Sequence, residues 1–234
     1  MVFDLDGTLM DHPAASRAAL ASVLCLEADV DAVSVDRLYR RWRSLEGVHF
    51  QRYLDGRTTF AGQRVARVME FGAAAGLPLA ATSDAEAWFA GYLAEYEARW
   101  TAFPDVGAAL GELRRQGFLL SVLTNGDHDQ QARKLRRLGL GDLPMLASSD
   151  VGARKPDGGM FRAACRAIGR DEAACAYVGD DPANDALAAA RAGLRGIWID
   201  RRGRRTAPEG IETIRELTEL AALVAAPSRL AVGP

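Results

Sequence analysis

The sequence predicts an α/β fold: a doubly wound parallel sheet into which an all-helical segment is inserted. Four short runs are apolar throughout rather than alternating, which is typical of strands buried on both faces of a parallel sheet. Helical patterns separate the later runs, and each ends just before a glycine, the usual left-handed helix stop. Residues 13–101 are rich in Ala, Arg, Glu and Leu and contain no convincing buried strand. We therefore expect strands and helices to alternate on either side of a helical insert.

The first strand, Met1-Val2-Phe3, leads directly into Asp4-Leu5-Asp6-Gly7-Thr8. If this strand persists through Asp6, its alternation points the Asp4 and Asp6 carboxylates in the same direction. Two carboxylates that close repel each other, and without compensation one of them takes up a proton. A divalent cation removes this conflict, and hard oxygen ligands suit Mg²⁺. The alternative interpretation is a solvated turn, where Asp and Gly are common.

The helical insert follows these carboxylates, so we expect it to form a lid at the end of the sheet where they lie. We expect its hinges near Met10–Pro13 and Thr101–Asp105, where prolines interrupt the chain. The chain then divides into a core of residues 1–12 and 102–234 and a helical cap of residues 13–101. The cap helices are expected at Pro13–Leu26, Val35–Leu45, Phe60–Ala75 and Asp84–Trp100, the last capped by Asp84 after a break at Gly76-Leu77-Pro78.

Strands and helices alternate along the second part of the core. The expected strands are Phe118–Leu123, Cys175–Val178 and Gly196–Ile199. The expected helices are Val106–Gln116, Gln130–Leu138, Met160–Ile168 and Asp185–Ala192. Most crossovers between the parallel strands should be right-handed. We expect the tail, Pro227–Pro234, to be frayed, with a strand in an oligomer as the alternative.

Polar groups follow each of the first three strands. Thr124 and Asn125 follow the second strand, and three carboxylates follow the third. Ligands bind beyond the carboxyl ends of the strands in open α/β sheets, so we expect these groups to converge on the carboxylates of the first strand. Lys155, in a loop, adds a cation. This combination suits Mg²⁺ and a phosphate group bound together. The three carboxylates are Asp180, Asp181 and Asp185.

The composition is that of an ordinary globular protein and excludes several partners. At 234 residues the chain is long enough for one large domain or two smaller ones, and 49% of its residues are hydrophobic. A formal net charge of −2 gives no case for nucleic-acid or anionic-membrane binding driven by bulk charge. No apolar run is long enough to span a bilayer, and a strand at Met1 leaves no room for a signal peptide. Cys25, Cys165 and Cys175 lack a metal-binding spacing, so we expect reduced thiols in a cytoplasmic protein.

Four motifs in order resemble those of the haloacid dehalogenase superfamily of hydrolases. They are Asp4-x-Asp6-Gly7-Thr8, Thr124-Asn125-Gly126, Lys155-Pro156 and Gly179-Asp180-Asp181-x-x-Asn184-Asp185. Each motif is weak alone, but four in order, each after an appropriate element, span nearly the whole chain. The resemblance implies a Rossmann-like core with strand order 5-4-1-2-3. It also implies that the insert is similar to the C1 cap of subfamily I.

The resemblance implies that the first motif supplies the two catalytic carboxylates. Asp4 is the implied nucleophile, which forms an aspartyl-phosphate. Asp6 is implied to protonate the leaving alkoxide and then to activate water for hydrolysis, and a carboxylate is competent for both tasks. The implied cofactor is Mg²⁺, held by Asp4, the backbone carbonyl of Asp6, and Asp180.

The remaining motif residues are implied to bind the phosphate group or to support the site. Lys155 and Thr124 would balance charge on the phosphoryl oxygens, and Asn125 would donate to them. Asp185 would orient Lys155 or a metal-bound water. Thr8 would support the site without contacting the metal ion or the phosphate group. The substrate is expected to be a small phosphorylated molecule, because a closing lid excludes larger phosphorylated partners.

Within this family the resemblance favours a Mg²⁺-dependent phosphatase acting on a sugar phosphate, a nucleotide or a phosphoglycolate-type metabolite. The 2-haloacid dehalogenases lack an acid at the position of Asp6 and need no Mg²⁺. Phosphonatases carry a Schiff-base lysine in the cap, and no Lys lies between Pro13 and Trp100. Phosphomutases of the β-phosphoglucomutase type share all four motifs and are the alternative. A phospho-acceptor signalling domain is a weaker alternative, because the acidic pair of receiver domains is adjacent and their acceptor lies on a later strand.

Several residues keep a purely structural alternative. Thr124 and Asn125 are alternatively residues that only end a strand. Lys155 is alternatively a solvated loop lysine. Asp185 is alternatively an acidic residue at a helix N-terminus, where the helix dipole stabilises its charge. Asp181 is either a helper of the site or a surface charge.

Residues of the insert also keep two interpretations. His12 is more consistent with a hinge residue than with a catalytic one. Cations and aromatic residues of the cap either bind an anionic part of the substrate or form a solvated helix face. They are Arg40, Arg41, Trp42, Arg43, His49, Arg52 and Tyr53. No pattern in the sequence indicates an oligomeric state or names the substrate.

Overall fold

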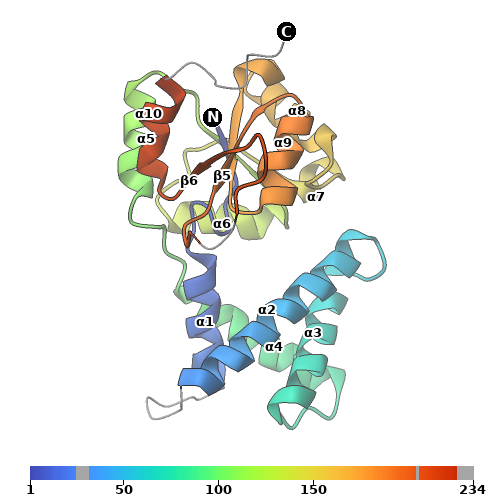
Figure 1. The fold of residues 1–234 in the computed structure, drawn as a ribbon. Coiled ribbons are helices and arrows are strands. Elements are labelled where there is room, and N and C mark those ends of the chain that lie inside the picture. Colours follow the sequence, from blue (N-terminus) through green and yellow to red (C-terminus); the bar gives the residue numbers. More distant parts are fainter. Residues whose placement is uncertain (25–31, 204–205, 226–234) are drawn as a thin grey trace. The chain divides into compact units, whose positions relative to one another are not determined.

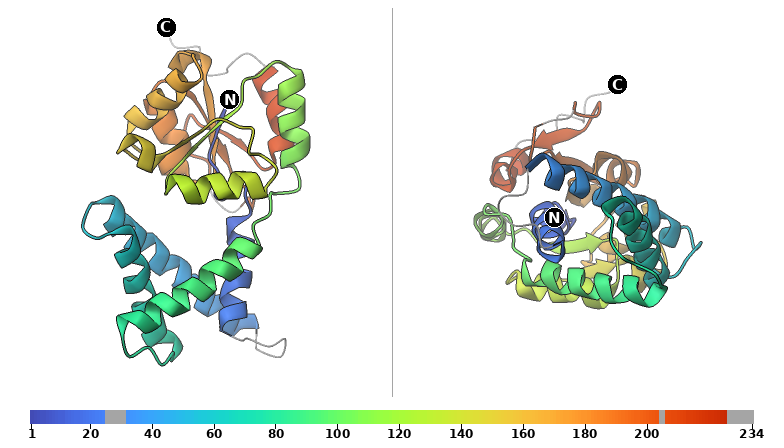
Figure 2. Two further views of the ribbon diagram at one scale, coloured as in Figure 1. Left: turned by 180° about the vertical axis from the view of Figure 1, so that it is seen from behind. Right: turned by 90° about the horizontal axis from the view of Figure 1, so that it is seen from below.

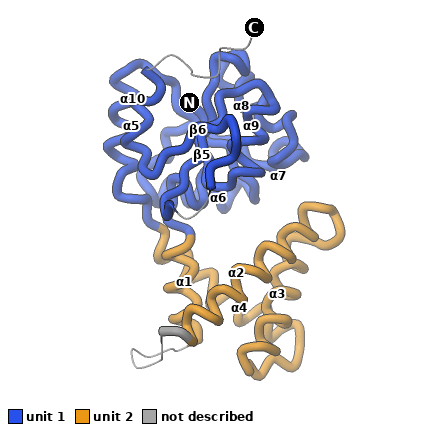
Figure 3. The backbone as a smooth tube through the Cα atoms, viewed as in Figure 1, with its two compact units in different colours: residues 1–12, 101–234 blue, residues 13–100 orange. Residues whose placement is uncertain are grey.

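The computed structural model describes residues 1–24, 32–203 and 206–225, and the chain divides into two units (Figure 3). Unit 1 comprises Met1–His12 and Thr101–Pro234, and unit 2 comprises Pro13–Trp100. Two sequence predictions, the reduced thiol of Cys25 and the frayed tail Pro227–Pro234, lie outside the described residues.

A parallel sheet forms the centre of unit 1, and the predicted doubly wound α/β fold is confirmed (Figure 1). Its six strands, as found in the described residues, lie in the order β3-β2-β1-β4-β5-β6. Read in reverse from β5, this is the order 5-4-1-2-3 that the resemblance implies, with β6 added at the edge. The strands are β1 (Val2–Phe3), β2 (Ser121–Thr124), β3 (Met145–Ala147), β4 (Ala176–Gly179), β5 (Arg195–Ile199) and β6 (Glu212–Ile214).

The central strands are the ones that the sequence predicts, because they are buried on both faces. Strands β1, β2 and β4 are wholly buried, and Val2 of β1 pairs with Ser121 on one side and Tyr177 on the other. The predicted start of β2 at Phe118 is three residues early, since Leu119 is 50% exposed. The edge strands β3 and β6 were not predicted: each has three residues and no long apolar run.

Helices lie on both sides of this sheet. Helices α5 and α10 lie side by side on one side, and α8 and α9 lie on the other (Figures 1 and 2). The predicted helix Asp185–Ala192 instead begins with a π-type turn, Pro182–Ala186, that leads into α9. The helices of unit 1 are α5 (Val106–Arg115), α6 (His128–Arg137), α7 (Ser148–Val151), α8 (Gly158–Ala167), α9 (Leu187–Arg191) and α10 (Leu220–Ala225), with single 3₁₀ turns at Glu172–Ala174 and Leu217–Glu219.

One part of the core packs α8 and α9 against β4. The Phe161 ring meets the Tyr177 ring edge-on, with centroids 5.0 Å apart. Cys165 and Cys175 belong to this cluster, and both are free and buried. Burial raises the pKa of the Cys165 thiol to about 12, so this cysteine behaves as a small apolar core residue.

The described residues of unit 2 form helices joined by turns and contain no strand. Its helices are α1 (His12–Val23), α2 (Ala32–Leu54), α3 (Phe60–Ala75) and α4 (Thr82–Ala98). Trp42 is fully buried, and its ring packs edge-on against Phe71, Trp88 and Tyr92. None of the described helices is both long enough and apolar enough to cross a membrane.

Several helix boundaries in unit 2 differ from the prediction. Helix α2 continues through Gly47 to Leu54, because His49, one turn further on, is buried and contacts Glu70 at 3.0 Å. Asp84 is the third residue of α4 rather than its cap, and its carboxylate accepts from the Ala80 and Ala81 amides at 2.9 Å each. The predicted break is confirmed, since Gly76 ends α3 with a φ of +69°.

The two chain connections between the units pair with each other at the unit 1 end. Met10 forms an antiparallel bridge with Ala102. The Asp11 amide donates to the Thr101 carbonyl, and the Phe103 amide donates to the Leu9 carbonyl, each at 3.0 Å. Both connections therefore leave the core at one place.

Candidate active site

Strand order brings the predicted site residues to one edge of the sheet. Asp4 follows β1, Thr124 ends β2, and Asp180 follows β4. Because β1 lies between β2 and β4, the carboxyl ends of the three strands are neighbours. Lys155 reaches the same place from the loop before α8.

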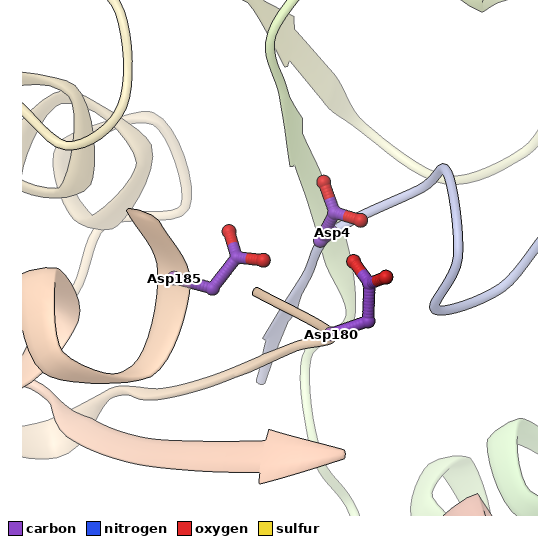
Figure 4. A group of neighbouring side chains, drawn as sticks. All are labelled: Asp4, Asp180 and Asp185. Atoms are coloured by element: carbon purple, nitrogen blue, oxygen red, sulfur yellow. The ribbon is translucent and has the colours of Figure 1, made fainter. Parts of the chain in front are cut away.

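Three carboxylates face one another at this edge (Figure 4). One oxygen each of Asp4, Asp180 and Asp185 lies within 4.8 Å of the other two. Asp4 and Asp185 are buried, whereas Asp180 reaches solvent. Gly7, with a φ of +97°, makes room for this cluster, since a Cβ there would lie 2.3 Å from Asp180 Oδ2. The turn of the first motif therefore requires glycine for two reasons.

Lys155 is the buried cation of the cluster. Its Nζ donates to Asp4 Oδ1 and Asp185 Oδ1 at 2.6 Å each and to the Tyr177 hydroxyl at 2.8 Å. Burial on its own lowers the pKa of a lysine, but Asp185 and Asp4 outweigh it and raise the pKa of Lys155 well above its usual value. Lys155 is therefore a permanent positive charge beside Asp4.

Asn125 fixes the loop that carries Lys155. Its Nδ2 donates to the Lys155 carbonyl at 3.0 Å, and its Oδ1 accepts from the Lys155 amide at 2.9 Å. The peptide bond that follows, Lys155–Pro156, is cis. The Asn125 side chain, predicted to bind substrate, thus uses its oxygen and one N–H in hydrogen bonds that position Lys155.

The donor set fits a divalent metal ion. Asp4 Oδ2 is buried and has no hydrogen-bond partner among the residues that the structure describes. Burial raises the pKa of Asp4 to about 7 in spite of Lys155. Asp180 is exposed on one side, but protein atoms around the rest of its carboxylate remove part of its hydration, and this partial desolvation together with Asp4 and Asp185 raises its pKa well above its usual value. Three carboxylates facing a single ammonium leave an excess of negative charge that a divalent cation offsets.

Asp6 has different partners from Asp4. Lys134 Nζ donates to both of its carboxylate oxygens at 2.7 Å, and Gln131 Nε2 donates to Oδ2 at 3.0 Å. Burial acts to raise the pKa of Asp6, but Lys134 and His12 outweigh it and lower this pKa. Strand β1 ends at Phe3, so the alternation argument for Asp4 and Asp6 does not apply. The carboxylate of Asp6 is not part of the three-carboxylate cluster.

Three residues that hold these side chains were not predicted from the sequence. They are Tyr177, which contacts Lys155, and Gln131 and Lys134 of α6, which contact Asp6. In the sequence, α6 looks like a polar helix with a solvated face. Gln131, Lys134 and Leu135 have the spacing of one helix face, and all three are buried. That spacing, directly after the Thr124-Asn125-Gly126 motif, is the signal that points to them.

Thr8 and Asp181 have structural partners. Thr8 is buried, and its carbonyl accepts from Arg201 at 2.7 Å. Asp181 caps the turn after β4: its Oδ1 accepts from the Ala183 and Asn184 amides at 2.9 and 3.0 Å. The Asp181 amide in turn donates to Asp185 Oδ2 at 3.0 Å.

Three of the cap residues named from the sequence pair with carboxylates of unit 2. Arg41 and His49 both contact Glu70, at 2.8 and 3.0 Å, and Arg43 pairs with Glu46. These contacts favour the solvated-face interpretation for the two arginines, and Trp42 is a core residue.

Comparison with known proteins links the chain to one family. A family model of haloacid dehalogenase-like hydrolases matches residues 1–193. A phosphoserine phosphatase from Thermus thermophilus is 32% identical over 92% of this chain and 94% of its own length. A phosphoglycolate phosphatase from Caulobacter vibrioides is 30% identical over 85% of this chain and 78% of its own length. An (S)-2-haloacid dehalogenase from Pseudomonas sp. strain YL is 32% identical over 54% of this chain and 55% of its own length.

Solved structures share the fold. The HAD-hydrolase YfnB from Bacillus subtilis, bound to magnesium, superposes with a TM-score of 0.74 at 22% identity. The match covers 99% of this chain and 97% of that chain.

Proposed function

The chain belongs to the haloacid dehalogenase-like hydrolases, and we propose that it is a Mg²⁺-dependent phosphatase that hydrolyses a small-metabolite phosphate monoester through an aspartyl-phosphate on Asp4. The observation that carries this proposal is the division of labour between two carboxylates. Asp4 is buried beside Lys155 in an acidic cluster, and Asp6 is held separately by α6. This separation supports the proposal that Asp4 acts as the nucleophile and Asp6 as the acid and base.

In the first step, an oxygen of Asp4 attacks the phosphorus of the substrate. The bond between phosphorus and the leaving oxygen breaks, and that oxygen takes a proton from Asp6. The products are the free alcohol, a phosphoryl group bonded to Asp4, and an ionised Asp6. Lys155 and the Thr124 hydroxyl stabilise the charge on the phosphoryl oxygens.

In the second step, the ionised Asp6 accepts a proton from water as the water oxygen attacks the same phosphorus. The bond between phosphorus and Asp4 breaks, which releases inorganic phosphate and restores both carboxyl groups. The same residue is acid in one step and base in the next, as microscopic reversibility allows.

Asp4, Asp180 and the backbone carbonyl of Asp6 would hold the Mg²⁺. When bound, the ion supplies positive charge that offsets the acidic cluster and the phosphoryl group. The buried, unpartnered Asp4 Oδ2 and the magnesium bound to YfnB support this assignment.

Asp6 also favours phosphatase over dehalogenase chemistry. A halide leaves as a stable anion and needs no proton, so a second carboxyl group held by two hydrogen-bond donors has no task in dehalogenation. The two phosphatases match more of the chain than the dehalogenase does.

We further assign residues 13–101 as a cap that admits a small substrate, whose leaving group it selects. Phosphoserine and phosphoglycolate are the first candidates, because relatives are named for them. The interdomain movement reported for YfnB supports a mobile cap. The free thiols of Cys165 and Cys175 support a cytoplasmic location.

The test is phosphate release from p-nitrophenyl phosphate, phosphoserine, phosphoglycolate, sugar phosphates and nucleotides, with Mg²⁺ and with EDTA. Asp4→Asn removes the nucleophile, and Asp171→Asn, at an exposed carboxylate before β4, is the matched control. We expect Mg²⁺-dependent release that Asp4→Asn abolishes and Asp171→Asn retains. Release that survives in EDTA or in Asp4→Asn would contradict the proposal.

A further inference from the structure

The structure holds Asp6 on α6 through two side chains that no motif of the family includes. Lys134 Nζ donates to Oδ1 and Oδ2 at 2.7 Å, and Gln131 Nε2 donates to Oδ2 at 3.0 Å. Lys134 is only 5% exposed and Gln131 is buried, so neither is a solvated surface residue that meets Asp6 by chance. A buried lysine and a buried amide are retained only where their donors are used.

Gln131 also connects Asp6 to Thr124. The same Nε2 donates to Thr124 Oγ1 at 2.7 Å, so both of its N–H bonds are committed. The Thr124 hydroxyl accepts from Gln131, and its own O–H donates only a long hydrogen bond, of 3.5 Å, to the Asn125 carbonyl, which a phosphate oxygen can replace. One amide thereby sets the direction of the acid–base carboxylate and of a phosphate donor together.

The local backbone keeps Gln131 in place. Gly126 has a φ of +149°, and a Cβ there would lie 3.3 Å from Gln131 Cδ. Asp127 caps α6 by accepting from the Gln130 amide at 3.0 Å, which fixes where the helix begins. The turn after β2 thus packs against the Gln131 side chain and leads directly into α6, the helix that carries Gln131.

These contacts also distinguish the two oxygens of Asp6. Oδ2 accepts two hydrogen bonds, from Lys134 and Gln131, whereas Oδ1 accepts one, from Lys134. A carboxylate oxygen has about two acceptor positions, so Oδ1 keeps one of them open. Oδ1 is therefore the oxygen that can exchange a proton with a substrate while the α6 contacts persist.

We propose that Gln131 and Lys134 are positioning residues that hold the Asp6 carboxylate with Oδ1 directed to the leaving group and to the attacking water. The inference rests on the proposed phosphatase function and adds two residues to it. Neither residue touches the substrate in this scheme; both act through Asp6, and Gln131 also acts through Thr124.

The test uses the dependence of the rate on the leaving group. A p-nitrophenolate ion leaves readily without a proton, whereas the alkoxide of phosphoserine or phosphoglycolate needs one, so a misplaced acid slows only alkyl phosphates strongly. We compare kcat/KM, which reports the steps up to release of the alcohol, for p-nitrophenyl phosphate and for the best alkyl phosphate. The variants are Gln131→Met and Lys134→Met, and the matched control is Arg137→Met at an exposed cation of the same helix.

We expect kcat/KM for the alkyl phosphate to fall by about 10- to 100-fold in both variants, and that for p-nitrophenyl phosphate by less than about threefold. Arg137→Met should change neither. Equal losses on both substrates, or no loss on either, would overturn the inference, because a merely structural role does not discriminate leaving groups. Should Lys134→Met fail to fold in thermal unfolding, Gln131→Met decides the question. A wild-type protein without Mg²⁺-dependent phosphate release would instead contradict the proposed function itself.

Discussion

At the scale of single residues, the substitution Asp180→Asn should have opposite effects on stability in the absence and in the presence of the metal ion. Asp4 and Asp180 have raised pKa values, so in the pH range above their ordinary pKa the folded state binds more protons than the unfolded state. The free energy of unfolding in EDTA therefore decreases as the pH rises from about 4 to 7. Asp180→Asn removes one of the two contributions to this pH dependence, and it also removes a negative charge that repels Asp4 and Asp185. We expect a higher Tm than wild type in EDTA at pH 7 and a weaker dependence on pH.

With saturating Mg²⁺ the order should reverse, because the variant lacks a proposed Mg²⁺ ligand and with it part of the stabilisation by bound metal. Thermal unfolding at pH 5 and pH 7, in EDTA and in Mg²⁺, measures both effects. Asp171→Asn is the control for the loss of one carboxylate. A lower Tm for Asp180→Asn in EDTA at pH 7 would contradict the charge-repulsion argument.

Gly7 offers a second prediction at this scale, with Gly117 as its control. Both have positive φ, +97° and +84°, so alanine is strained at either position, at a cost of about 1–2 kcal/mol. A Cβ on Gly7 would also collide with Asp180 Oδ2, whereas a Cβ on Gly117 meets no atom within 4 Å. Gly7→Ala should raise the Mg²⁺ concentration needed for half-maximal activity by about 10-fold or more. Gly117→Ala should lose stability alone, and a similar metal requirement in both variants would contradict the argument.

At the scale of elements, the turn after β4 depends on Asp181. Its carboxylate accepts from two backbone amides of the turn, and the loss of such a cap costs about 1 kcal/mol. We expect Asp181→Ala to lower the free energy of unfolding by about that amount, measured with urea. Asp181→Ser should retain most of it, because serine is also a good cap. Equal losses in the two variants would show that the charge of Asp181, rather than the cap, is what matters.

The elements that the sequence predicts and those that it misses differ in burial. Strands β1, β2, β4 and β5 are apolar because they lie inside the sheet, and their composition alone indicates them. Strand β6, Glu212–Ile214, is an edge strand of three residues, and its composition gives no such signal. Its position follows from pairing with β5, which is a long-range contact that no local pattern encodes.

The site residues also divide into those that local patterns predict and those that depend on long-range contacts. Asp4, Thr124, Lys155 and Asp180 follow from motifs at strand ends, and strand order brings them together. Gln131 was not predicted, because its use depends on which face of α6 turns towards β1, and this is a property of tertiary packing. The ordinary expectation for polar residues on a helix is a solvated face.

At the scale of the whole molecule, bound metal should stabilise the two units unequally. The residues that fit the metal ion all belong to unit 1. A ligand that binds the folded form at 100 times its Kd stabilises it by about 2.7 kcal/mol. Hydrogen exchange with Mg²⁺ and without it should show this extra protection in β1, β2 and β4 and a much smaller change in α3. Equal protection of α3 would show that the units unfold as one.

The thiols give a prediction for the core of unit 1. Cys165 and Cys175 are buried, and the Cys165 pKa of about 12 keeps that thiol protonated at neutral pH. In native protein at pH 7.5, iodoacetamide should leave the peptides that contain these two residues unlabelled, and labelling should appear in denaturant. Mass spectrometry of the digested protein measures this for each cysteine separately. Rapid native labelling of Cys165 would contradict its burial.

The paired connections at Met10 and Ala102 have a consequence for the engineering of this protein. Because the two connecting segments pair with each other where they leave the core, a short hairpin could join them. The path of the chain through the sheet would then stay the same. An insert of another size or architecture can therefore replace residues 13–100 as a cassette, without altering the register of any strand. Under the proposed function, such an exchange would leave the residues assigned to catalysis in the core and would change only the segment assigned to substrate selection.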